Sequence, residues 1–456
     1  MITRRALAGL AAAGAAGGAF AARAEQDGAR PSGRREEVRA LRAFAERTHP
    51  RGREAAADAK WRATWDELEA QASRAGDGAY FVGLWRGLSW FRDGHTTAIP
   101  FEFAGGGPEP LRGGPFGQQL PWRVRTFHDG FYVTEARDEA RSLLGARIVR
   151  MNGVADAELM RRLCAVWPGN EPWAQHWSWT LFNNAALLQG LGVVDGREPV
   201  RVEAVLDGRP VGATLRPRRD AAKDLDALPR RQFEREVWAA RYRRGNYVHP
   251  LPQSRTLYVS IDDMADLAGR TFEALTREAF TAMERPGLQR IVIDLRRNGG
   301  GNNFLPEALR KHLGRSRFNR PGGLYVLIGP ATFSAAQNMA NRLERETFAT
   351  FIGDPTGGSP NHYGDAEMFR GEATDVRAIV STLPWFDSYP SDQRPYISPD
   401  LPQPMTFAAW RDGRDTALAT ALSHRTTAQA NELDRARIFY FSRPSQKVAW
   451  TPFWKA

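Results

Sequence analysis

One serine, two histidines and a run of glycines are the residues of this chain whose types and surroundings suit catalysis. Ser334 follows an apolar strand-like run and the turn Gly329-Pro330-Ala331, at the point where a helical pattern begins. A helix N-terminus offers free N–H groups and a positive dipole end, and both stabilise a developing oxyanion. Serine is also a common helix N-cap, so the position alone leaves both roles open.

A serine nucleophile needs a base to take its proton. His95 lies in the segment Asp93-Gly94-His95-Thr96, and His362 lies in the segment 357–365. Both segments are polar and glycine-rich, which is typical of the loops where functional residues concentrate. The residues by themselves do not choose between the two histidines.

Three consecutive glycines, Gly299–Gly301, follow the apolar run Ile291–Leu295. Glycine can adopt positive φ and lets the backbone approach a ligand closely, so the N–H groups of such a turn can face a negative charge. The run is neither a Walker loop, because no Gly-Lys-Ser/Thr follows, nor the dinucleotide fingerprint.

The elements that must position these residues alternate between strand and helix after Arg255. The expected strands are 257–261, 291–295, 325–328 and 348–352, and the expected helices are 272–283 and 334–346. Short apolar runs bounded by glycine predict buried strands, and their alternation with helices predicts a layered α/β domain.

The preceding part of the chain has a different pattern. Apolar spacings of three and four predict helices from Glu36 to Phe91, and short alternating runs predict strands at 122–125, 130–133 and 146–150. Asp207-Gly208 between two such runs predicts a hairpin. The tryptophans from Trp167 to Trp179 are expected to serve packing.

The N-terminus has the form of an export signal. Two arginines follow Thr3, an Ala- and Gly-rich run extends to about Ala22, and Ala22-Arg23-Ala24 is a suitable cleavage site. The adjacent arginines resemble a twin-arginine signal. We expect residues 1–24 to be removed and the mature protein to be periplasmic or extracellular, without a membrane span.

Composition excludes several other classes. The formal net charge of +11 reflects arginines dispersed among acidic residues, and the chain carries no nucleic-acid-binding motif, so no nucleic-acid partner is expected. A single cysteine, Cys164, permits no intramolecular disulfide. No His/Asp/Glu cluster has metal-ligand spacing, so neither a metal nor another cofactor is expected.

Four segments, in order, resemble those of peptidase family S41, which contains the tail-specific proteases and the tricorn core. They are Asp93–Thr96, Ile293–Gly301, Phe333–Gln337 and Ile352–Gly358. The resemblance implies a ClpP/crotonase-like layered α/β catalytic domain over 251–425. It also implies a degenerate PDZ-like, β-rich region over 118–250, after a helical region over 25–117 and before an aromatic tail over 426–456.

The resemblance also implies the catalytic residues. No lysine occurs between Ser334 and Pro402, so the family's Ser–Lys design does not apply and the tricorn-like Ser–His–acid design is expected. It implies Ser334 as nucleophile, His95 as base and Asp392 as acid, with the N–H groups of Gly300 and Ala335 holding the oxyanion. His362 and Asp365 are the second choices for base and acid.

The implied function is hydrolysis of peptide bonds in a peptide or protein substrate through an acyl-enzyme on Ser334. Three alternatives stay open: an inactive peptide-binding relative, an esterase or amidase acting on small substrates, and a crotonase-like relative that binds acyl-CoA. The sequence indicates neither the cleavage specificity nor the oligomeric state.

Overall fold

The computed structural model describes residues 33–99, 101–104, 107–110, 117–195, 198–219, 221–228, 245–426 and 450–455. The expected export signal, residues 1–24, and most of the aromatic tail lie outside these ranges. Within them, no helix has the length and apolar character needed to cross a membrane.

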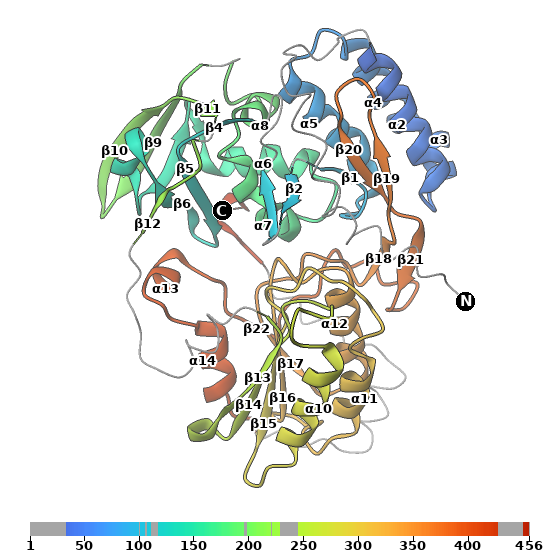
Figure 1. Ribbon diagram of the computed structural model, residues 1–456, viewed down its shortest axis with the longest axis vertical. Coiled ribbons are helices and arrows are strands. Elements are labelled where there is room, and N and C mark those ends of the chain that lie inside the picture. Colours follow the sequence, from blue (N-terminus) through green and yellow to red (C-terminus); the bar gives the residue numbers. More distant parts are fainter. Residues whose placement is uncertain are drawn as a thin grey trace.

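The predicted α/β domain is built on a six-stranded sheet in the lower half of Figure 1, with strand order β13-β14-β15-β16-β17-β22. The strands from β14 to β22 run parallel, and β13 pairs antiparallel with β14. The strands are β13 (Tyr247–Leu251), β14 (Thr256–Ser260), β15 (Arg290–Asp294), β16 (Leu324–Ile328), β17 (Thr350–Gly353) and β22 (Leu401–Pro402).

Helices cover both faces of this sheet, as its strands, apolar on both sides, require. Figure 1 shows α10 (Phe272–Met283), α11 (Glu307–Arg315) and α12 (Ala335–Glu346) on one side and α14 (Thr416–Ser423) on the other. Alternate strand residues enter two separate cores, with Ile291 and Ile293 in one and Val292 in the other. The expected layered α/β architecture is therefore confirmed.

The helical pattern predicted near the N-terminus is also present. It forms α2 (Arg34–Thr48), α3 (Gly52–Ala57), α4 (Ala59–Gln71), α5 (Asp77–Leu88) and the 3-10 turn η3 (Ser89–Phe91). Trp61, Trp65 and Trp85 are almost completely buried between these helices. The loop after η3 carries His95 and leads into β1 (Thr97–Ala98).

A seven-stranded antiparallel sheet forms the upper left part of Figure 1. It comprises β5 (Trp122–Phe127), β6 (Gly130–Ala136), β7 (Arg147–Met151), β8 (Val154–Ala155), β9 (Val200–Leu206), β10 (Arg209–Leu215) and β12 (Asp226–Ala227). Asp207 and Gly208 have φ of 48° and 79°, as the predicted hairpin turn requires. The PDZ-like character of this region stays a prediction.

The remaining described elements connect or cover these units. The helices are α6 (Asp156–Val166), α7 (Glu171–Leu181), α8 (Ala185–Gly190) and α13 (Phe407–Arg411), with the 3-10 turns η5 (Asp138–Leu143), η6 (Pro252–Ser254) and η7 (Phe453–Lys455). The strands are β2 (Phe101–Ala104), β3 (Gly107–Pro110), β4 (Gln118–Gln119), β11 (Arg218–Arg219), β18 (Asn361–Gly364), β19 (Glu367–Arg370), β20 (Arg377–Val380) and β21 (Leu383–Phe386). From the tail, Trp454 is buried in the core shared with α6 and β6.

Strands β18 to β21 form an arm that leaves the α/β domain and reaches the N-terminal helices. Within the arm β18 pairs with β21, and β19 pairs with β20, which in turn pairs with β1. The turn of the arm is fixed by the buried carboxylate of Glu37 on α2. It accepts hydrogen bonds from the N–H groups of Ala373 and Thr374, at 2.9 and 3.0 Å, and from the hydroxyls of Thr374 and Tyr80.

We predict that Glu37→Ala lowers the free energy of unfolding by about 2–3 kcal/mol, because buried donors lose their acceptor. Glu36→Ala is the matched control, since Glu36 is the exposed neighbour on the same helix. Urea unfolding followed by circular dichroism measures both. Equal losses for the two variants would contradict the anchoring role of Glu37.

Candidate active site

Ser334 connects β16 to α12 and has an unusual backbone conformation. Its φ is 53° and its ψ is −127°, a combination that an L-residue rarely adopts. Such a conformation costs on the order of 1–3 kcal/mol and persists only where the surroundings enforce it. A strained turn between a strand and a helix also presents the nucleophilic serine of α/β-hydrolases.

Ser334 does not act as a helix cap, although it occupies the N-cap position. Its side chain makes no capping hydrogen bond to α12. Among the described residues, no acceptor takes the N–H of Ala335, the first residue of the helix. The hydroxyl and the adjacent N–H are thus both available to a ligand, as the predicted nucleophile and oxyanion donor would have to be.

The glycine loop lies directly over this serine. Gly300 has a φ of 116°, and a Cβ added to it would lie 2.4 Å from Ser334 Cβ and 3.1 Å from Ala335 N. Any side chain here would collide with the serine turn. Gly300 is therefore glycine for two independent reasons, its backbone conformation and the close approach to Ser334.

Asn298, a residue that the sequence analysis did not single out, joins the glycine loop to the serine turn. It is fully buried. Its side chain accepts from Gly300 N–H at 2.8 Å and donates to Ile261 O at 2.9 Å, and its carbonyl accepts from Phe333 N–H at 3.1 Å. The sequence predicts Gly300 N–H as an oxyanion donor, but in this structure that group is bonded to Asn298, so of the two predicted donors Ala335 N–H is the available one.

His95 lies beside Phe333, the residue that precedes Ser334, and His362 lies beside His95. The ring of His95 stacks on Phe333 with centroids 4.3 Å apart, and the ring of His362 lies 5.7 Å from that of His95. Trp173 stacks on Phe333 at 3.9 Å. The predicted packing role of this tryptophan therefore includes the wall of the site.

No hydrogen bond joins Ser334 to His95 among the described residues, and catalytic hydrogen bonds are often longer without substrate.

His362 is less suited to be the base. It is buried, and its Nδ1 lies 3.0 Å from the carbonyl of Ser359, which only a protonated Nδ1 can contact as a donor. Burial, with a further contribution from His95, lowers the pKa of His362 to about 4. A general base works best with a pKa near the operating pH. His95, with 15% of its side chain exposed, is the histidine that a substrate could reach.

Asp93, which belongs to the same motif as His95, is the acid in contact with the His95 ring. One carboxylate oxygen lies 3.6 Å from His95 Nδ1 and accepts the His95 backbone N–H at 3.0 Å. The other accepts the hydroxyls of Thr96 and Ser381 at 2.7 and 2.6 Å. Ser381 follows β20, so the arm described above completes the shell of this carboxylate.

The charge of Asp93 is strongly favoured. Burial raises its pKa, but the imidazoles of His49 and His95 and the hydroxyl of Ser381 lower it by more, so the pKa lies well below the ordinary range. The carboxylate is therefore ionised at neutral pH. A buried, permanent negative charge beside an imidazole orients the ring and stabilises its cation.

The two acids proposed from the sequence have other contacts. The carboxylate of Asp392 is hydrogen-bonded by Ser388 and Arg394, and Arg394 is also paired with Glu344. The carboxylate of Asp365 accepts from the indole N–H of Trp385 at 2.7 Å. Among the described residues, no contact joins either carboxylate to a histidine.

Other reactive groups of the described chain lie outside this site. Burial raises the pKa of the Cys164 thiol to about 12, which makes it a poor nucleophile. No group of three His, Cys, Asp or Glu side chains among the described residues could hold a metal.

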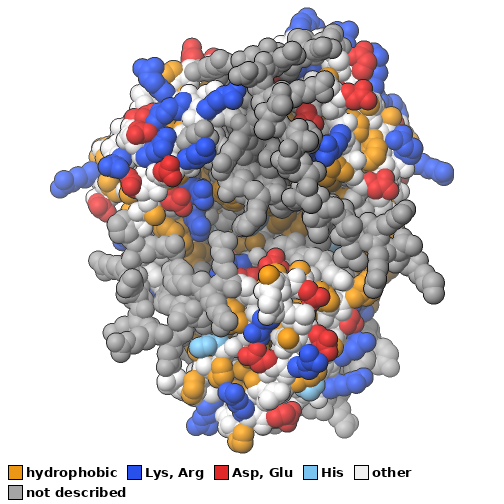
Figure 2. Space-filling model, in the orientation of Figure 1, with side chains coloured by type: hydrophobic (Ala, Val, Ile, Leu, Met, Phe, Trp, Pro, Cys, Tyr) orange, Lys and Arg blue, Asp and Glu red, His pale blue; other side chains and the backbone are white. Residues whose placement is uncertain are grey.

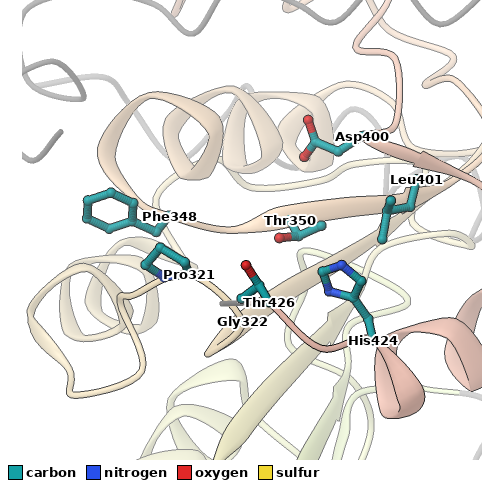
Figure 3. Close-up of a pocket in the computed structure, with 8 residues that line it drawn as sticks. All are labelled: Pro321, Gly322, Phe348, Thr350, Asp400, Leu401, His424 and Thr426. Atoms are coloured by element: carbon teal, nitrogen blue, oxygen red, sulfur yellow. The ribbon is translucent and has the colours of Figure 1, made fainter. Parts of the chain in front are cut away.

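A cavity of about 250 Å³ at the end of β17 is lined by Phe348, Asp400, His424 and others, and contains none of the predicted site residues (Figure 3). On the face shown in Figure 2, basic and acidic side chains of the described residues are intermixed.

Solved structures of other proteins share the fold of this chain. No protein-family model and no curated protein matches the chain. Mature CPAF in complex with lactacystin is 11% identical, with a TM-score of 0.56 over 90% of this chain and 99% of that chain. Mature CPAF alone is also 11% identical, with a TM-score of 0.54 and coverages of 90% and 98%. The photosystem II D1 C-terminal processing protease matches at 12% identity with a TM-score of 0.37, covering 81% of this chain and 93% of that one.

The chain therefore has the fold of mature CPAF over most of its length, with the layered α/β domain that its motifs predict. At this level of identity the comparison concerns the fold, and the chemistry has to be argued from the site itself.

We predict that Gly300→Ala lowers the free energy of unfolding by more than about 2 kcal/mol, because the new methyl group meets Ser334 and the positive φ becomes strained. Gly299→Ala is the matched control. A Cβ there would have no atom within 4 Å, and we expect a loss below about 1 kcal/mol. Guanidinium unfolding measures both, and similar losses would show that the loop does not press on the serine turn.

Proposed function

We propose that this protein is a serine peptidase of family S41 that hydrolyses peptide bonds through an acyl-enzyme on Ser334. The observation that carries this proposal is the conformation of Ser334. The residue is held in a strained backbone geometry at the start of α12, its hydroxyl does not cap the helix, and the glycine loop covers it. Strain of this kind, maintained without any structural benefit from the hydroxyl, supports a catalytic role.

In the proposed mechanism the Ser334 hydroxyl attacks the carbonyl carbon of the substrate while His95 takes its proton. Because His95 Nδ1 is the nitrogen near Asp93, Nε2 is the one that accepts. The Ala335 N–H and the positive end of α12 stabilise the oxyanion. The C–N bond then breaks, His95 returns the proton to the leaving amine, and water activated by His95 hydrolyses the ester.

We assign the orienting acid to Asp93 in preference to Asp392. Asp93 is buried, ionised and 3.6 Å from the His95 ring, and its second oxygen accepts the hydroxyls of Thr96 and Ser381. Asp392 is engaged with Arg394, an arrangement typical of a structural ion pair. The assignment puts base and acid two residues apart on the loop between η3 and β1.

The proposed substrate is a peptide or protein encountered outside the cytoplasm. The twin-arginine-like N-terminus supports export, and the arrangement of Ser334 at the start of α12 supports peptidase chemistry.

A fluorophosphonate probe tests the nucleophile. We expect the mature wild-type protein to be labelled and Ser334→Ala to be unlabelled, while the matched control Ser359→Ala is labelled at the wild-type rate. A folded wild-type protein that resists the probe would instead support the inactive, peptide-binding alternative. Hydrolysis of a quenched peptide library, compared with simple esters, separates a peptidase from an esterase.

The acid is tested by two asparagine variants. We expect Asp93→Asn to slow probe labelling by about 10³–10⁴-fold, because the His95 ring loses its orientation and the stabilisation of its cation. Asp392→Asn should lower the thermal midpoint by removing an ion pair but change the labelling rate little. The reverse pattern would reinstate Asp392 as the acid.

A further inference from the structure

Two imidazoles approach the Asp93 carboxylate, one at each oxygen. His95 Nδ1 lies 3.6 Å from Oδ1, and His49 Nε2 lies 3.6 Å from Oδ2. Both nitrogens are buried, and neither has a hydrogen-bond partner in the described structure. Buried polar atoms without a partner are rare and call for an explanation. The mechanism above uses His95 and leaves His49 unexplained.

The proton of a neutral His49 ring can be placed. Its Nδ1 accepts a hydrogen bond from the backbone N–H of Arg51 at 3.0 Å, so Nδ1 carries the lone pair. A neutral imidazole has one donor and one acceptor nitrogen, and the donor is then Nε2. The N–H of His49 therefore faces Asp93.

The His49 ring is held in this orientation. Residue 49 ends α2 in an extended conformation, because Pro50 disfavours a helical residue before it. The side chain is 0% exposed, and it lies between Phe91, stacked at 3.9 Å, and Tyr363, at 4.7 Å. The donor is thus fixed by packing from α2, η3 and the arm, all outside the α/β domain.

We propose that His49 is a positioning residue of the active site. The His49 N–H faces Oδ2 of Asp93, so the negative charge of this carboxylate acts on both His49 and His95. The catalytic unit then comprises Ser334, His95, Asp93 and His49. The inference rests on the proposed function only in assigning catalysis to Ser334 and His95. The juxtaposition of the two rings about one buried carboxylate is independent of it.

The other groups around this unit are few. His362 lies against His95, and Tyr363 lies against His49 with Arg51 and Glu54 acting on its hydroxyl. The remaining donors to Asp93 are the His95 backbone N–H and the hydroxyls of Thr96 and Ser381, which do not titrate in the working range. A change in pH behaviour caused at residue 49 must therefore pass through Asp93.

A matched pair of substitutions isolates the Nε2–H donor. In His49→Asn the amide oxygen replaces Nδ1 as acceptor for Arg51 N–H, but nothing replaces Nε2–H. In His49→Gln the amide N–H reaches the Nε2 position and restores a donor to Asp93.

We expect His49→Asn to lower kcat about 10-fold at unchanged KM, because Asp93 and then His95 lose their alignment. The acid limb of the kcat–pH profile of this variant should move to higher pH, because the charge of the Asp93 carboxylate then acts on His95 alone. His49→Gln should behave as wild type in both respects.

The NMR titration of the His95 ring provides a second readout that needs no catalysis. Its midpoint should move upward in His49→Asn and stay at the wild-type value in His49→Gln. If wild type proves not to react with the fluorophosphonate probe, the proposed function fails and this titration still decides the role of His49. Equal behaviour of the two variants in both the pH profile and the titration, with only a change in thermal midpoint, would overturn the inference.

Discussion

The hydrogen bonds of Asn298 are the interaction on which the rest of the site depends. One buried side chain donates to the end of β14 through Ile261 and accepts from Gly300, while its carbonyl accepts from Phe333. An amide is needed because both a donor and an acceptor must be satisfied at one point. An aspartate or leucine here would leave buried backbone groups without partners.

This fixed geometry explains how the strain at Ser334 is maintained. The glycine loop lies against the serine turn. Phe333 is bonded to Asn298 and packed between the rings of Trp173 and His95, and α12 begins directly after Ser334. A strained conformation persists where neighbouring contacts over-determine it. The hydroxyl and the Ala335 N–H are consequently presented together, with no reorganisation required at the moment of reaction.

The site is assembled from distant parts of the chain. The nucleophile and the glycine loop belong to the α/β domain, whereas His95, Asp93 and His49 belong to the N-terminal helical region. The arm of β18 to β21 connects the two regions: its Ser381 hydroxyl binds Asp93, and its turn is fixed by Glu37.

Much of the fold could be predicted, because the strands and helices of the α/β domain have strong apolar periodicity. The expected helix 272–283 matches α10, and Ser334 stands at the N-cap of α12 as expected. The motifs also predict Ser334 and His95 as site residues. In the structure the His95 ring stacks on Phe333, the residue before Ser334.

What the sequence could not supply were contacts across large separations. Asp93 and Ser381 are 288 residues apart, and nothing in the pattern of either segment indicates that they meet. The motifs therefore predict the acid near the C-terminal motif, at Asp392, whose side chain is paired with Arg394. Likewise, the capture of Gly300 N–H by Asn298 depends on a side-chain orientation that spacing does not encode.

The central claim is that Ser334 is a nucleophile whose oxyanion is held at the start of α12. A crystal structure of the fluorophosphonate-treated protein tests it most directly. The account predicts a phosphonyl group on Ser334 Oγ, with its oxygen about 2.7–3.1 Å from the Ala335 N–H. An adduct on another residue, or a phosphonyl oxygen directed away from the helix N-terminus, would contradict the account.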